Sequence, residues 1–491
     1  MNIGASQMCV LTARVVLIML AAAALGPTTL GAPQTESAAP ALRLAEAEVA
    51  ALNRRLGGLP AGTRAALVVA DAATGQTLYA RNGDELLKPA SVQKLFTTAA
   101  ALQHFPPDFA FQTQLFLVGE DLWVIGGGDP ALGDPRLAAR DDLPLDHVLA
   151  GWADALRDAG VQSVHRLVLD DSIFDEQHRH PDWPDSQSDR WYQAPVGGLN
   201  FNNNCVDVTL SVAGSRVLAR LTPELPDNWL ENRAQVGKQQ RPVLRRQPHR
   251  DVVELAGTVV RGGALDPVSV YRPTIFFGHV LRSGLTRHGV PVTGPITPRT
   301  PDLGQPAGAR LVAVHRTPLA DVVWRCNTFS QNMFAEALFK ALAAYGSDGR
   351  RTGVSASWDT GREVLLREMA TLGVSMDGAR VRDGSGLSHS NRVSAATIVR
   401  LLVAMRGHAR WPVFEASLAR AGELGSMNRR YGRDGLRGRL VGKTGTLRDV
   451  SALAGYATRT DGSVLAFAVL INGEAPADLT LRICETLVGG E

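Results

Sequence analysis

Pro89-Ala90-Ser91-Val92-Gln93-Lys94-Leu95-Phe96 places a serine and a lysine three residues apart at a predicted helix start. Side chains at positions i and i+3 share one face of a helix. A lysine held beside a hydroxyl can take its proton once the lysine is deprotonated, so this face could carry a nucleophile and its base. Ser-x-x-Lys also arises by chance about once or twice in a chain of this length and ordinary composition. A surface helix is therefore the alternative, and the rest of the sequence must supply the partners.

The composition is that of a globular protein with several domains. The chain has 491 residues, of which 45% are hydrophobic and 20% are charged, and this length suggests about two to four domains. With 51 basic and 48 acidic residues the net charge is +3. This balance argues against nucleic acid or a membrane surface as the main partner.

Residues 1–31 are predicted to be a secretory signal peptide. Arg14 precedes the uncharged apolar run from Val15 to Leu25, and Gly26-Pro27 ends that run. The run is too short to span a bilayer, although an uncleaved anchor remains the alternative. We expect a periplasmic enzyme, since the three cysteines left after cleavage allow at most one disulfide and form no disulfide framework: Cys205, Cys326 and Cys484.

Strand and helix patterns divide the remaining chain into three parts. The first part contains a helix over 42–56 and a hairpin of strands 65–70 and 76–80. The middle, from about 105 to 318, has short apolar runs separated by Gly, Pro and Asp and is predicted to be a β-rich insertion. The last part contains helices near 319–342, 359–372, 394–405 and 477–487, and strands near 439–446, 451–457 and 464–472. Strands at both ends with helices between them indicate one α/β domain closed by its two termini.

Two further motifs could complete the site at Ser91. Ser330-Gln331-Asn332 offers a hydroxyl for proton relay and a carboxamide that both donates and accepts, although read alone it is typical of a helix cap. Lys443-Thr444-Gly445-Thr446 is followed by Leu447 and then by alternating strands. A lysine, two hydroxyls and a glycine on a sheet edge could bind the carboxylate of an extended substrate. The alternative is a strand end with a solvated lysine.

The order Ser-x-x-Lys, Ser-x-Asn, Lys-Thr-Gly is that of class A β-lactamases and penicillin-binding proteins. The chain resembles the class C low-molecular-mass penicillin-binding proteins, serine D-alanyl-D-alanine carboxypeptidases and endopeptidases of the penicillin-binding protein 4 type. The long segment between Ser91 and Ser330 favours this family over compact β-lactamases, and Gln331 stands where relatives often have Asp. Further motifs carry the resemblance: Val69–Gly75, Gly127–Pro130 and Asp383–Ser388.

The resemblance implies a penicillin-binding transpeptidase fold with an antiparallel sheet flanked by helices. The catalytic domain is expected to be discontinuous, formed by residues 42–105 and 315–491. Residues 106–314 are expected to form the β-rich insertion, in two subdomains.

The resemblance also implies roles for the motif residues. Ser91 would attack the carbonyl between two D-alanines, neutral Lys94 would be the base, and Ser330 would pass a proton to the leaving amine. Lys443 would help keep Lys94 deprotonated. Backbone N–H groups of Ser91 and Thr446 would form the oxyanion hole. The remaining residues would bind substrate, the amide at Asn332 and the terminal carboxylate at Lys443, Thr444, Gly445 and Thr446.

The expected substrate is a peptidoglycan stem peptide, and β-lactam antibiotics are the expected acylating inhibitors. No cofactor is implied, and no metal site is expected because His178 and His180 lack a third patterned ligand. The resemblance makes Asp185 or Asp189 a candidate for recognising an amine on the stem peptide, while Glu336 is expected to be a salt-bridge partner on a helix surface. A loose membrane association is open, and so is the oligomeric state.

Two other functions remain open at this point. A β-lactamase on the same scaffold would turn over penicillin quickly. A non-catalytic penicillin-sensing or wall-binding protein would not need its serine.

Overall fold

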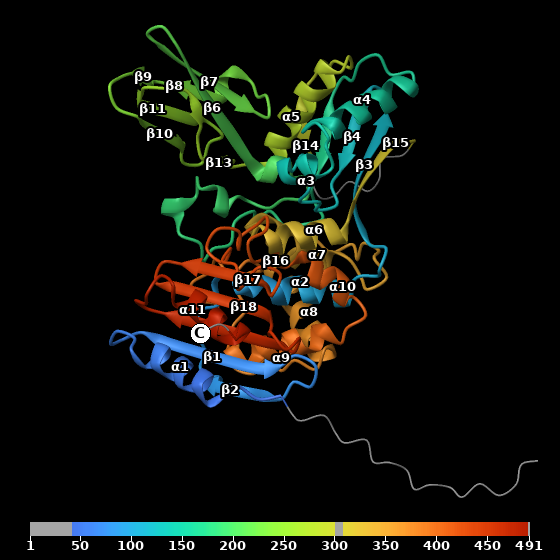
Figure 1. Ribbon diagram of the computed structural model, residues 1–491. Coiled ribbons are helices and arrows are strands. Elements are labelled where there is room, and N and C mark those ends of the chain that lie inside the picture. The colour runs from blue at the N-terminus through green and yellow to red at the C-terminus, as the bar shows by residue number, and fades with distance from the viewer. Residues whose placement is uncertain (1–41, 300–307, 490–491) are drawn as a thin grey trace, which may run out of the picture. The chain divides into compact units, whose positions relative to one another are not determined.

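The computed structural model describes residues 42–299 and 308–489 (Figure 1). The predicted signal peptide lies outside these residues. No helix in the described ranges is long and apolar enough to cross a membrane. The strands form a six-stranded, an eight-stranded and a five-stranded sheet. The predicted α/β class is confirmed.

The six-stranded sheet joins the two ends of the described chain. Its strand order is β16-β17-β18-β19-β1-β2, and all neighbouring strands are antiparallel. The register of β1 and β19 runs from Arg64 opposite Asn472 to Asp71 opposite Leu465. The predicted hairpin and C-terminal strands are confirmed. The strands are β1 Arg64–Asp71, β2 Thr77–Arg81, β16 Ala419–Arg420, β17 Leu440–Leu447, β18 Val450–Thr458 and β19 Val464–Asn472.

Helices cover both faces of this sheet because its central strands are apolar on both faces. Successive side chains of a strand point to opposite faces. Leu67 of β1 therefore packs in one cluster with Leu52 of α1, whereas Val68 belongs to another cluster with Leu95 of α2. The helices of this region are α1 Glu46–Gly57, α2 Lys94–His104, α8 Trp358–Thr371, α9 Ala395–Arg406, α10 Trp411–Ser417 and α11 Leu479–Val488. The short α10 was not predicted.

The helical pattern predicted over 319–342 is two helices. They are α6, Leu319–Thr328, and α7, Asn332–Ala344. Between them Ser330 has φ +60°, in the left-handed region, which a continuing right-handed helix cannot contain. The Gln331 side chain then accepts a hydrogen bond from the Asn332 N–H. This break sets Ser330 on a turn at the start of α7.

The insertion contains two sheets. The five-stranded sheet has the order β14-β5-β4-β3-β15, and the eight-stranded sheet has β10-β11-β9-β7-β6-β12 with β13 on β6 and β8 on β11. The antiparallel pairing of β3 with β15 extends to Pro318, which lies opposite Ala110. The strands are β3 Ala110–Val118, β4 Asp121–Ile125, β5 Leu167–Asp170, β6 Cys205–Ala213, β7 Arg216–Thr222, β8 Leu230–Asn232, β9 Gln235–Val236, β10 Arg241–Arg246, β11 Val253–Val259, β12 Gly263–Ala264, β13 Val268–Ser269, β14 Ile296–Pro298 and β15 Arg310–Pro318.

Three helices of the insertion were not predicted. They are α3, Pro135–Arg140, α4, His147–Asp158, and α5, Pro273–Arg287. In α4 the buried residues Val148, Trp152 and Leu156 repeat every four positions. This helical spacing was readable from the sequence, but the frequent Gly, Pro and Asp of the region favoured strands and turns.

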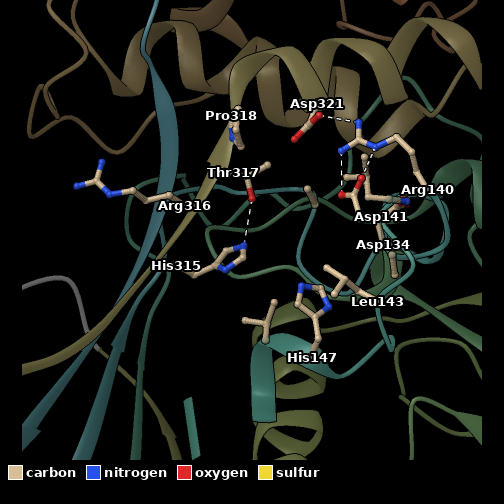
Figure 2. A pocket seen from close by; sticks show the side chains of 14 residues that line it. Asp134, Arg140, Asp141, Leu143, His147, His315, Arg316, Thr317, Pro318 and Asp321 are labelled. Atoms are coloured by element: carbon tan, nitrogen blue, oxygen red, sulfur yellow. Dashed lines mark hydrogen bonds and ion pairs between the residues drawn. The ribbon is translucent and has the colours of Figure 1, made fainter. Parts of the chain in front are cut away.

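The chain returns from the insertion to the catalytic region where β15 meets α6, and α3 packs beside this junction (Figure 2). Arg140 of α3 donates hydrogen bonds to Asp321 of α6 and to Asp141. Asp134 caps α3 by accepting the N–H of Leu137, and it also accepts from Arg325 Nε at 3.0 Å. The Asp134–Arg325 pair is almost fully buried, with side-chain exposures of 0% and 7%.

We predict that Asp134→Ala lowers the free energy of unfolding by about 3–5 kcal/mol, because it leaves the Arg325 guanidinium buried without its carboxylate. The matched control is Asp141→Ala, whose exposed ion pair contributes less than about 1 kcal/mol. Urea unfolding of both variants measures the difference. Equal small losses would contradict a structural role for the buried pair.

Candidate active site

Ser91 and Lys94 lie on adjoining turns at the start of α2. A 3₁₀ turn, Ala90–Gln93, precedes the helix and Lys94 is its first residue. The Lys94 ammonium is buried and lies 3.0 Å from Ser91 Oγ. It also donates to Asn332 Oδ1 at 2.6 Å and to the Ser385 carbonyl at 2.8 Å. The predicted nucleophile and base are therefore in hydrogen-bond contact.

Ser330 and Lys443 form a second hydroxyl–ammonium pair. Lys443 of β17 is buried, and its Nζ donates to Ser330 Oγ at 2.8 Å and to the Thr444 carbonyl at 2.8 Å. Asn332 accepts from Lys94 and donates to the Tyr192 carbonyl at 2.7 Å. The structure thus brings the three predicted motifs together from α2, the α6–α7 turn and β17.

Burial weakens the basicity of both lysines. It lowers the pKa of Lys94 from 10.5 to about 8, while the charges of Glu336 and Asp383 act in the opposite direction. The pKa of Lys443 lies well below 10.5, first because of burial and second because of the Lys94 charge. We expected the charge of Lys443 to lower the pKa of Lys94. The main cause is instead the burial of Lys94 itself. A lysine with a pKa near 8 is neutral in a useful fraction of molecules near neutral pH.

The loop Asp383–Ser388 is a part of the site for which no role was predicted. Its Ser385 carbonyl holds Lys94, and Asp383 is buried with its carboxylate accepting from Gly386 N–H, Ser388 N–H and Trp183 Nε1. Trp183 belongs to the insertion. The sequence signal was the motif itself, but its contacts join positions about 200 residues apart and no local pattern reveals them.

Two glycines allow the site's segments to touch. Gly386 has φ +83°, and a Cβ there would lie 1.9 Å from the Ala90 carbonyl oxygen. A Cβ at Gly445 would lie 2.7 Å from the Pro89 carbonyl oxygen. Gly445 therefore lets β17 approach the turn that carries Ser91, and a contact of Gly445 with substrate stays a prediction.

A cleft of about 390 Å³ opens beside these groups. Its catalytic-region lining includes Ser91, Ser330, Asn332, Thr444 and Thr446, and the insertion contributes Pro184, Gln187, Trp191 and Tyr192. Trp191 is 40% exposed. Neither Asp185 nor Asp189 lines this cleft: among the described residues Asp185 pairs with Arg179 and Asp189 with Arg190.

The expectation for Glu336 is wrong. Glu336 lies on α7 with 0% exposure and accepts from three N–H donors. A charged residue inside a helical pattern is normally placed on the surface because an isolated charge is costly to bury. Here the three buried N–H donors offset part of that cost.

Comparison with known proteins gives the family. Residues 48–486 match the D-Ala-D-Ala carboxypeptidase 3 (S13) family. The chain is 32% identical over 456 residues to the D-alanyl-D-alanine carboxypeptidase of Actinomadura sp. (strain R39), covering 86% of this chain and 80% of that protein. It is 25% identical over 441 residues to the D-alanyl-D-alanine carboxypeptidase DacB of Haemophilus influenzae, covering 86% and 88%.

A solved structure supports the fold. The crystal structure of penicillin binding protein 4 from Haemophilus influenzae matches with a TM-score of 0.73 and 22% identity, covering 89% of this chain and 98% of that one. The predicted penicillin-binding fold with a large insertion is confirmed. The chain belongs to the D-Ala-D-Ala carboxypeptidase 3 (S13) family, among the class C low-molecular-mass penicillin-binding proteins.

We predict that Gly386→Ala destabilises the protein by about 2–5 kcal/mol, from the left-handed backbone and the clash with Ala90. Gly151 of α4 has open space around its Cβ position, so Gly151→Ala should stabilise by up to about 1 kcal/mol. Urea unfolding measures both. A neutral Gly386→Ala variant would contradict the close contact between the loop and the Ser91 turn.

Proposed function

We propose that the protein is a serine D-alanyl-D-alanine carboxypeptidase with D,D-endopeptidase activity on peptidoglycan stem peptides. It works through an acyl-enzyme on Ser91, and penicillin inhibits it by acylating the same hydroxyl. The observation that carries the proposal is the buried Lys94 ammonium 3.0 Å from Ser91 Oγ, with a pKa lowered to about 8. A serine beside a lysine of lowered pKa is an activated nucleophile.

Acylation begins when neutral Lys94 takes the Ser91 proton. Ser91 Oγ forms a bond to the carbonyl carbon between the two D-alanines, and the backbone N–H groups of Ser91 and Thr446 stabilise the oxyanion. The C–N bond then breaks. Ser330, held by Lys443 at 2.8 Å, passes a proton to the leaving amine. The proton that Lys94 took from Ser91 replaces it, so Lys94 returns to its neutral form as the terminal D-alanine departs.

Substrate binding uses the rest of the cleft. Asn332 holds the substrate amide, and the terminal carboxylate lies against Lys443 and the two hydroxyls of Thr444 and Thr446, with Gly445 beside the substrate backbone. Water then hydrolyses the Ser91 ester, which releases the shortened peptide as a carboxylate and restores the hydroxyl. An endopeptidase reaction has the same steps, with the amine of a cross-linked peptide as the leaving group.

The enzyme's place in the cell follows from its substrate. Peptidoglycan lies outside the cytoplasm, so we infer export by the signal peptide at residues 1–31 and a periplasmic location. We also propose the domain division 42–105 and 315–491 around the insertion 106–314, which the shared six-stranded sheet supports.

Purified protein given muropeptide monomers and cross-linked dimers tests the proposed function. We expect loss of one alanine from monomers and cleavage of dimers, both measured by mass spectrometry. Ser91→Ala should abolish both reactions because it removes the nucleophile. No change in either substrate with the wild-type protein would contradict the proposal.

Penicillin turnover and the Ser91→Ala variant distinguish the proposed enzyme from a β-lactamase and from a non-catalytic protein. The proposed enzyme retains a long-lived penicilloyl adduct on Ser91, whereas a β-lactamase would release the hydrolysed antibiotic quickly. A non-catalytic sensing or wall-binding protein would keep its biological effect in the Ser91→Ala variant.

We predict that penicillin acylation speeds up with pH until Lys94 is deprotonated. Since the pKa of Lys94 is about 8, the rate should rise roughly tenfold per pH unit below that value and level off above it. Intact-protein mass spectrometry at quenched times measures the rate. Lys238→Met, which changes an exposed lysine of the insertion, is the control and should leave the profile unchanged. A rate independent of pH between 6 and 9 would contradict Lys94 as the base.

A further inference from the structure

Helix α7 carries a buried polar stripe that starts at the active site. Asn332, Glu336 and Lys340 are spaced four residues apart, which places them on one face of the helix. All three are buried, with exposures of 8%, 0% and 0%. Asn332 contacts Lys94, and Lys340 donates to Asp175 of the insertion at 2.6 Å. Glu336 lies between them, and the proposed mechanism gives it no role.

Glu336 binds the loop that holds Lys94. Its carboxylate accepts the N–H of Gly384 at 2.9 Å and the N–H of Ser385 at 2.8 Å. Trp358 Nε1 of α8 donates to it at 2.7 Å. Both peptide N–H groups of this dipeptide are therefore fixed by one side chain.

The carbonyl groups of the same dipeptide point to α2. The Gly384 carbonyl accepts from Thr97 Oγ1 at 2.7 Å, and the Ser385 carbonyl accepts from Lys94 Nζ at 2.8 Å. The dipeptide thus links Glu336 on one side to Lys94 on the other. Displacing it would move one of the three acceptors that orient the Lys94 ammonium toward Ser91.

We propose that Glu336 is a positioning residue for the reaction at Ser91, fixing the Gly384–Ser385 dipeptide so that the Ser385 carbonyl holds Lys94 in line with the nucleophile. This inference rests on the function proposed above, in which Lys94 is the base. Glu336 does not touch the reacting atoms, and it acts through the loop.

The charge of Glu336 also affects the pKa of Lys94, in addition to the position of its ammonium group. A negative group near Lys94 stabilises its ammonium form and so raises the pKa of Lys94 against the effect of burial. Burial and the Asp383 charge raise the pKa of Glu336 itself to about 7. The charged or titratable groups that interact with Lys94 or Glu336 are Cys326 of α6, Lys340 of α7, Asp383 of the loop and Lys443 of β17.

Glu336→Gln tests both effects of Glu336, its hold on the Gly384–Ser385 dipeptide and its charge near Lys94, while keeping the size of the side chain. An amide has one acceptor oxygen and an NH₂ group that only donates, so at least one of the three N–H donors loses its acceptor. We expect the penicillin acylation rate at its high-pH plateau to fall about tenfold to a hundredfold. The midpoint of the pH profile should move to lower pH, because the variant lacks the negative charge that favours protonated Lys94.

Glu336→Asp separates position from charge. It keeps the negative charge but shortens the side chain, so we expect a reduced plateau rate with the wild-type pH midpoint. This variant also serves if Glu336→Gln fails to fold. A wild-type plateau rate in folded Glu336→Asp would overturn the proposal, as would a wild-type rate and midpoint in folded Glu336→Gln.

Glu368→Gln is the matched control. Glu368 is a buried carboxylate on α8 that pairs with His104 at 3.0 Å and with Arg367 at 3.7 Å. Within the described ranges no hydrogen bond or ion pair joins it to the loop of Ser385. Its rate and pH midpoint should match the wild type even where thermal unfolding shows lost stability. A shift in the pH midpoint as large as that of Glu336→Gln would overturn a specific role for Glu336.

A wild-type protein that penicillin does not acylate at Ser91 would instead contradict the proposed function, and with it this inference.

Discussion

The burial of the Lys94 ammonium is the constraint on which the site depends. A charged or strongly polar group removed from water must find hydrogen-bond partners inside the protein. Lys94 finds three, and they come from the turn before α2, the start of α7 and the loop at Ser385. Asn332 and Ser385 are 238 and 291 residues away in the chain. The folded protein can satisfy this one side chain only when those segments meet, so the same contacts that permit its burial also bring Ser91 and Asn332 to the proposed base.

The insertion takes part in this arrangement. Its Tyr192 carbonyl accepts from Asn332, its Trp183 donates to Asp383, and its Asp175 accepts from Lys340. Trp191 and Tyr192 also line the cleft. The insertion is therefore joined by hydrogen bonds to α7 and to the 383–388 loop, and it forms part of the cleft wall.

Sequence patterns predicted the parts of the site whose residues lie close together in the chain. Ser91 with Lys94, Ser330 with Asn332, and the run from Lys443 to Thr446 each occupy a single turn or strand, and their order in the chain gave the family. The five longer strands of the six-stranded sheet were predicted because their apolar runs end at turn residues, whereas the two-residue β16 was not predicted.

The remaining features depend on contacts between distant segments. Glu336 and Lys340 look like surface residues because charges inside a helical pattern are usually solvated. Only the fold shows the N–H donors around Glu336 and the acceptors that Asp175 and Gln177 offer to Lys340. Helix α4 was missed although its apolar residues repeat at helical spacing, since turn residues around it favoured strands. The loop role of Asp383 and the approach of Gly386 to Ala90 are likewise invisible without the folded chain.

In the proposed mechanism the fold keeps Lys94 neutral enough to act as a base. The chain has only five lysines, Lys88, Lys94, Lys238, Lys340 and Lys443, so NMR of protein labelled with ¹³Cε-lysine can follow each one through a pH titration, with single Lys→Met variants to assign the signals. We expect the Lys94 signal to titrate with a midpoint near pH 8, because burial lowers the pKa of Lys94 to about 8. A Lys94 that titrates at the ordinary value of 10.5 would contradict it.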